Sequence, residues 1–161
     1  MHRWSIVLFA ALVAGCGGRS AADYQRDARA ALDAGDSTKA IKVAEEGLAQ
    51  DAVKQDAAGA WRLEQIRVDA LASSGKAADV KRELDRLAVA YPKQVTASMY
   101  RSLADKVKAA GDVAGAVDIL TAGDQRFPAE HASFVEAIGG LQRAAPLDPA
   151  QVERLKKLGY L

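Results

Sequence analysis

The heptapeptide GDSTKAI at residues 35–41 returns in altered form as GDVAGAV at residues 111–117. The glycine that opens both has a third counterpart in the tripeptide SGK at residues 74–76. The spacings between the three glycines are 40 and 36 residues. Self-similarity at intervals of this size is typical of proteins built from stacked repeats. We therefore expect three copies of one structural unit.

Residues of similar character recur at equal distances from each of these glycines. Before the glycine, apolar residues three to four positions apart, such as Tyr24, Ala28 and Ala31, share one face of an amphipathic helix. After the glycine, small residues in most of the copies would let a second helix lie close to the first. The positions eleven before, five after and twelve after the glycine hold Tyr24, Glu64 and Tyr100; Ala40, Val80 and Ala116; and Gly47, Leu87 and Gly123.

The sequence around each glycine predicts a tight turn between two helices. Glycine adopts the positive φ that ends the first helix, and Asp36 or Asp112 can accept from the free amides that begin the second. Pro92 and Pro128 come seventeen residues after their glycines, where proline cannot continue a helix. Each unit is thus expected to be a helical hairpin.

These hairpins resemble the tetratricopeptide repeat (TPR), a helix–turn–helix unit of about 34 residues. Both GDSTKAI and GDVAGAV look like its turn followed by the small residues that start its second helix. The resemblance covers about residues 21–54, 61–94 and 97–130 of a helical domain at 21–161. It implies an all-α fold, a short α–α superhelix of about three TPR-like hairpins.

The middle unit departs most from the pattern. It has Glu64 where an aromatic residue is usual, Lys76 for aspartate and Val80 for a small residue, and residues 55–60 lengthen the junction before it. A generic alanine-rich helical bundle is the alternative fold.

A degenerate fourth hairpin at residues 131–161 is expected to cap the stack, because terminal repeats need an atypical outer face. Its first helix is predicted at 130–143, broken by the weak pair Gly139-Gly140. Asp148-Pro149 has the order of an N-cap and a first-turn proline, which predicts a short helix at 151–158.

The first residues have the layout of a secretory signal peptide, with a basic start and then a run of apolar residues. The run ends as Leu12-Val13-Ala14-Gly15-Cys16, which resembles the lipobox of bacterial lipoproteins. The resemblance implies a signal peptide at 1–15, cleavage between Gly15 and Cys16, and diacylglycerol and an acyl chain such as palmitate on Cys16. Residues 16–20 would then be a flexible tether. The alternative is a cysteine that ends a hydrophobic stretch by chance.

Lipoprotein sorting implies a location as well. Asp after the lipidated cysteine signals inner-membrane retention in that family, and this chain has Gly17. We expect an outer-membrane anchor facing the periplasm, with the inner membrane and the cell surface left open.

The composition excludes several classes of function. The 161 residues include 22 basic and 21 acidic side chains, one cysteine and two histidines. This balance gives no electrostatic footprint for nucleic acid, and one cysteine forms no disulfide framework or cysteine-based zinc site. His131 has no nucleophile or metal-ligand spacing near it in the sequence, and SGK lacks the rest of a phosphate loop. We expect no enzyme activity, no cofactor and no metal.

The TPR resemblance implies that the first helices of the hairpins form a groove for a partner protein. TPR lipoproteins include pilotins, assembly subunits and adaptors for peptidoglycan hydrolases, so we expect an adaptor or assembly factor that binds a protein of the bacterial envelope. The chain has no asparagine, which argues against the clamp that some TPR proteins form around a terminal carboxylate. A structural subunit of a larger envelope complex, or an envelope enzyme or ligand-binding lipoprotein, remains the alternative. The expected groove residues are Gln25, Arg26, Arg29, Gln65, Asp69, Arg101 and Asp105.

Overall fold

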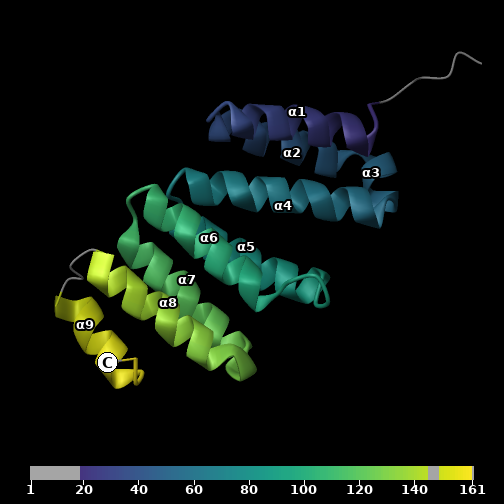
Figure 1. The fold of residues 1–161 in the computed structure, drawn as a ribbon. Helices are drawn as coiled ribbons and strands as arrows, with labels where there is room; N and C mark the ends of the chain where they lie inside the picture. The colour runs from purple at the N-terminus through teal and green to yellow at the C-terminus, as the bar shows by residue number, and fades with distance from the viewer. Residues whose placement is uncertain (1–18, 145–148, 161) are drawn as a thin grey trace, which may run out of the picture.

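The computed structural model describes residues 19–144 and 149–160, which form helices joined by short turns, with no strand among them (Figure 1). The prediction of an all-α fold is confirmed. The elements are α1 (Ala21–Asp33), α2 (Ser37–Ala49), α3 (Asp51–Gln55), α4 (Ala57–Ser73), α5 (Ala77–Ala90), α6 (Ala97–Ala109), α7 (Val113–Arg126), a 3₁₀ turn (Pro128–Glu130), α8 (His131–Ala144) and α9 (Pro149–Lys157).

The predicted turns join α1 to α2, α4 to α5 and α6 to α7. Gly35, Gly75 and Gly111 have φ angles of 79°, 71° and 97°, the left-handed conformation that glycine adopts without steric cost. The carboxylates of Asp36 and Asp112 accept from the amides of Lys39 and Gly115 at 2.9 and 2.7 Å, as expected of N-caps.

The helices pack in sequence order along the molecule. α1 pairs with α2, and α6 pairs with α7. α4 packs against both helices of the first pair, against α5 and against α6, while α7 packs against α5 and α8. Figure 1 shows this progression from α1 at one end to α9 at the other.

Close contacts between the paired helices depend on glycine. A Cβ atom on Gly47 would lie 2.8 Å from Cβ of Tyr24, and one on Gly123 would lie 2.9 Å from Cβ of Tyr100. Both tyrosines are buried in the apolar core. The small residues at these positions therefore let the second helix approach the first, as the sequence predicts.

The structure departs from the sequence prediction in α4, α8 and α9, and α9 runs from Pro149 to Lys157 rather than over 151–158. α4 begins at Ala57, in the stretch expected to be a junction, because the carboxylate of Asp56 caps the amide of Gly59 at 2.9 Å. The expected break at Gly139-Gly140 is wrong, since α8 continues through both glycines. Phe134, Ile138 and Leu141 recur on one face of α8 and are buried, so packing outweighs the weak helix propensity of the glycines.

The last helix is held to the end of the stack. Leu155 of α9 is buried in the core, and Arg154 forms an ion pair with Asp118 of α7. Gly159 ends the helix with a φ of 81°, and the amide of Tyr160 donates to the carbonyl of Leu155 at 3.0 Å. The expected N-cap at Asp148 lies outside the described residues.

Candidate functional site

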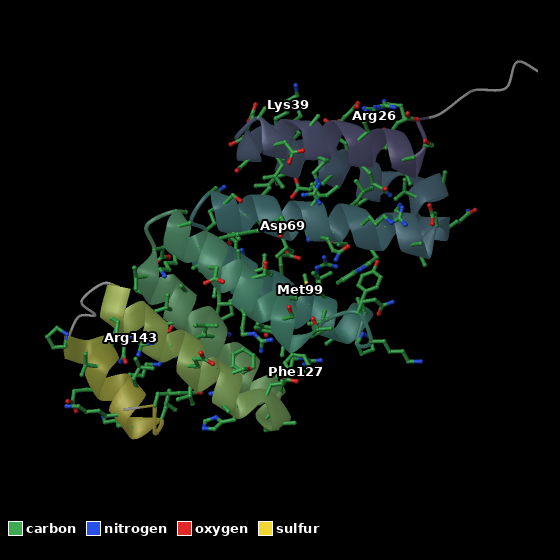
Figure 2. The ribbon with its side chains drawn as sticks, in the orientation of Figure 1. Arg26, Lys39, Asp69, Met99, Phe127 and Arg143 are labelled. Carbon is green, nitrogen blue, oxygen red and sulfur yellow. The ribbon has the colours of Figure 1, made fainter. Side chains whose placement is uncertain are left out.

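Three neighbouring hollows lie along the side of the molecule formed by α1, α4, α6 and α8, which we call the first-helix face. The first hollow lies between α1 and α4, the second between α4 and α6, and the third between α6 and α8. Figure 2 shows the side chains, with Arg26, Asp69, Met99 and Arg143 of this face labelled. Each residue expected in the groove lines at least one hollow: Gln25, Arg26, Arg29, Gln65, Asp69, Arg101 and Asp105.

The first hollow is rich in arginine. Arg26, Arg29 and Arg62 line it together with Gln25 and Gln65, and no carboxylate of the described residues does so. Arg26 Nη1 lies 3.0 Å from Asp23 Oδ1, and the hydrogen bonds that Arg26 donates to Asp23 and then to Asp27 raise its pKa.

Gln25 and Arg62, which also line the first hollow, differ in their contacts. Gln25 Nε2 donates to the carbonyl of Gly59 at 3.1 Å, which fixes α1 against the start of α4. Arg62 forms no ion pair with any residue in 19–144 or 149–160.

The second hollow contains a carboxylate between two cations. Asp69 of α4 lies 2.6 Å from Lys106 Nζ of α6 and 3.8 Å from Arg29 Nη1 of α1. The remaining lining is mostly uncharged and polar, including Ser98 and Ser102. Asp69 thus links three first helices, and its charge is neutralised within the protein.

The third hollow joins α6 to the C-terminal cap. Arg101 Nη1 donates to Ser133 Oγ at 2.6 Å and lies 3.6 Å from Glu130 Oε2. Its guanidinium carbon is 5.5 Å from the centre of the Phe134 ring, within the range of a cation–π contact. The other charged residues that line this hollow are Asp105, Lys108, Glu136 and Arg143.

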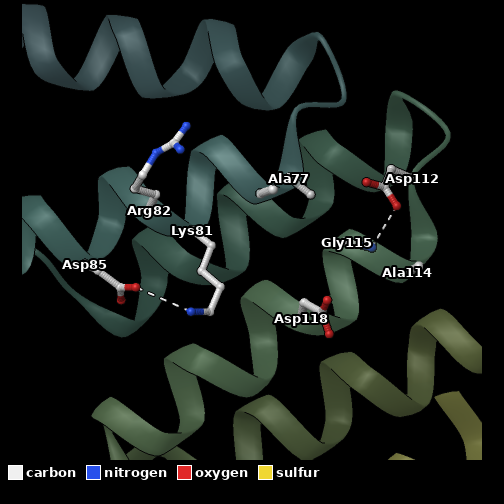
Figure 3. A pocket seen from close by; sticks show the side chains of 9 residues that line it. Ala77, Lys81, Arg82, Asp85, Asp112, Ala114, Gly115 and Asp118 are labelled. Carbon is white, nitrogen blue, oxygen red and sulfur yellow. Dashed lines mark hydrogen bonds and ion pairs between the residues drawn. The ribbon is translucent and has the colours of Figure 1, made fainter.

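A further hollow of about 530 Å³ lies between α5 and α7, away from the predicted groove (Figure 3). Small residues, including Ala77 and Gly115, form part of its lining. Lys81 Nζ lies 3.4 Å from Asp85 Oδ2 at its edge. Sequence reasoning did not find this hollow, because its residues lie on the two second helices that the repeat pattern treats as structural.

Sequence reasoning also missed the surroundings of His131. Its Nδ1 atom lies 2.9 Å from the carboxylate of Asp124 in α7, and the hydroxyl of Tyr160 donates to the same carboxylate. Asp124 is buried, and burial followed by the hydrogen bond to Asp124 raises the pKa of Tyr160. The cluster holds the residues after α9 against α7.

This cluster is incomplete as a catalytic site. His131 exposes 57% of its side chain and bonds the carboxylate of Asp124, which also accepts from the Tyr160 hydroxyl, and this cluster contains no serine or cysteine nucleophile. Across the described ranges, no group of three or more potential metal ligands comes together.

The proposed lipidation and cleavage residues, Cys16 and Gly15, lie outside the described residues. Among the helices that the structure describes, none has the length and apolar character needed to cross a membrane. The chain matches no protein-family model, no curated protein and no solved structure.

Proposed function

We propose that this chain is a lipid-anchored, TPR-like protein of the bacterial envelope whose first-helix face binds another protein. The observation that carries the proposal is the grouping of seven sequence-predicted residues, from α1, α4 and α6, along three adjoining hollows. Stacked helical hairpins use such a face, made from successive first helices, to bind partners. The role is that of an adaptor or assembly factor, comparable to a pilotin or an assembly subunit.

The hairpin geometry supports the TPR-like part of the proposal. Three turns with a positive-φ glycine lie at intervals of 40 and 36 residues, and two of the three have an aspartate N-cap. The first and third hairpins repeat the same contact between a tyrosine and a glycine. A generic bundle has no reason to repeat these features in register.

The chemistry of the face supports binding rather than catalysis. Its hollows contain arginine, lysine, glutamine and serine side chains on the exposed sides of rigid helices. Asp69 and Arg101 are already paired within the protein, which stabilises the arrangement of the helices. The exposed donors between them suit a polar segment of a partner.

The membrane part of the proposal rests on the sequence from Leu12 to Cys16. Two acyl chains anchor a protein durably to a bilayer, whereas one holds it only marginally. Lipid on Cys16 would leave the helical domain in the periplasm, facing its partner. Cys16→Ser is expected to abolish lipid labelling and to release the chain from the membrane fraction; continued attachment would reject the lipid anchor.

In-cell photo-crosslinking tests the binding face. A photoreactive residue at the exposed position Ser102, in the second hollow, is expected to yield a discrete crosslinked partner. The matched position is Ala78, exposed at the hollow between α5 and α7, where no equivalent product is expected. Crosslinks from Ala78 but not from Ser102 would place the binding face elsewhere and reject the proposal.

A further inference from the structure

Basic residues outnumber acidic residues in the lining of the first-helix face. Its three hollows are lined by seven basic and three acidic residues, although the whole chain has 22 and 21. The hollow between α5 and α7 has the opposite bias, with two basic and three acidic residues. Asp23, Asp27 and Glu130 lie beside this lining and pair with Arg26 and Arg101, so the excess of basic residues is confined to the lining itself.

The imbalance is greatest in the first hollow. Arg62 has no ion-pair partner in the described part of the chain, and Arg29 has only the 3.8 Å contact with Asp69, which Lys106 approaches more closely. Two guanidinium groups on facing helices thus retain most of their capacity to bind an anion. A guanidinium group binds a carboxylate through two parallel hydrogen bonds, which gives both strength and orientation.

The rest of the first hollow suits a peptide. The amide of Gln65 can both donate to and accept from a peptide backbone. An isolated anion would use the arginines alone, whereas a peptide segment would use all of these groups.

We propose that the first-helix face binds an extended, acidic segment of the partner protein, and that Arg29 and Arg62 bind its carboxylate side chains. This inference rests on the proposed function and specifies the chemistry of the partner. Packed helices lie about 8–10 Å apart, so a segment that crosses from α1 to α6 covers about 20 Å, or about six extended residues. Several acidic side chains in such a length would neutralise the excess charge of the lining.

Fluorescence anisotropy with defined peptides tests this inference on the full chain in a neutral detergent. The probe is a labelled peptide of about eight residues in which glutamate alternates with serine and leucine, which exceeds the expected span. Its control has lysine at every glutamate position. The acidic peptide is expected to bind at least about tenfold more tightly than its control, and added salt is expected to weaken it.

Charge-reversed variants assign the binding to the first hollow. Arg29→Glu combined with Arg62→Glu is expected to weaken binding of the acidic peptide at least about tenfold. Arg82→Glu, combined with Lys81→Glu so that the net charge changes equally, is the matched control, because both residues are exposed and line the hollow between α5 and α7. It is expected to leave the affinity unchanged, and circular dichroism checks that all variants remain helical.

Three results would overturn the inference: equal binding of the two peptides, equal loss of affinity in the control variant with Lys81→Glu and Arg82→Glu, or competition by inorganic phosphate or anionic phosphatidylglycerol vesicles without preference for the acidic peptide. The third would indicate a site for free or lipid phosphate. Crosslinking from Ser102 to a partner segment without acidic residues would reject the acidic segment and leave the proposed function intact. Absence of crosslinking from Ser102 would reject the proposed function itself.

Discussion

Glu64 is one of the residues at which the middle hairpin departs from the repeat pattern. It stands where the other two units have Tyr24 and Tyr100, yet it is almost completely buried. Its carboxylate Oε2 lies 3.0 Å from Arg67 Nη2 and 2.6 Å from Arg86 Nη2, so the buried charge is paired. The spacing of three residues between Glu64 and Arg67 is visible in the sequence, but the pairing with Arg86 is not, because Arg86 lies on α5.

The second helix of the middle hairpin, α5, also departs from the repeat pattern. Where the outer hairpins have Gly47 and Gly123, the middle hairpin has Leu87, which is fully buried. The bulky residue is therefore on the second helix in the middle unit and on the first helix in the outer units. α4 and α5 are in contact, but less extensively than α1 with α2 or α6 with α7.

Gly123→Ala is expected to destabilise the fold. Its Cβ would lie 2.6 Å from Phe134 Cε1 and 2.9 Å from Tyr100 Cβ, and both side chains are buried with little room to move. Overfilling a core costs about 1–3 kcal/mol, while alanine gains at most about 1 kcal/mol over glycine in helix propensity. We expect the free energy of unfolding to fall by about 1 kcal/mol or more in urea titrations.

Gly139→Ala is the matched control within α8. The nearest atom to its Cβ would be Arg143 Nη1 at 3.5 Å, an ordinary contact. Here the gain in helix propensity acts alone, so the free energy of unfolding is expected to rise by about 0.5–1 kcal/mol. If the free energy of unfolding changed with the same sign in Gly123→Ala and Gly139→Ala, the packing argument would be contradicted.

At the scale of the element, the start of α5 lacks the cap that the other second helices have. The backbone at Lys76 has φ −86° and ψ 61°, close to −87° and 72° at Asp36, but its side chain caps nothing. Lysine also places a positive charge at the positive end of the helix dipole. The geometry for an N-cap is present at this position, but the side chain that would use it is missing.

Lys76→Asp is therefore expected to stabilise the protein. An N-cap hydrogen bond and a favourable charge at the helix start together contribute about 1 kcal/mol. Thermal and urea unfolding, followed by circular dichroism, would measure the gain, with Asp112→Ala expected to lose about the same amount. An unchanged or lower stability of the Lys76 variant would show that the α5 start does not accept this cap.

The element-scale comparison also shows what sequence patterns can predict. Turn glycines, N-caps and apolar spacing are local, so the hairpins could be predicted from the residues around positions 35, 75 and 111. The continuity of α8 through Gly139 could not, because it depends on burial of Phe134 and Ile138 against other parts of the fold. Contacts between segments that are distant in the sequence decide whether a helix continues through such a glycine.

At the scale of the whole molecule, the packed helices present the first-helix face and, elsewhere, the hollow between α5 and α7. The residues expected in the groove follow from the resemblance to the TPR, and in the structure they line three adjoining hollows on one side. The contact of Tyr160 with Asp124 could not be predicted from the sequence, since it joins the end of the chain to α7 without any repeated signal. The meeting of Arg29 and Arg62 in one hollow likewise emerges only when α1 and α4 are placed together.

The measurement that tests the central claim most directly is a map of backbone amide shifts by nuclear magnetic resonance during titration with the acidic peptide. We predict that the largest changes fall on α1, α4 and α6, around Arg29, Arg62 and Gln65. Changes concentrated on α5 and α7, around Lys81 and Asp118, or spread evenly over all helices, would contradict it.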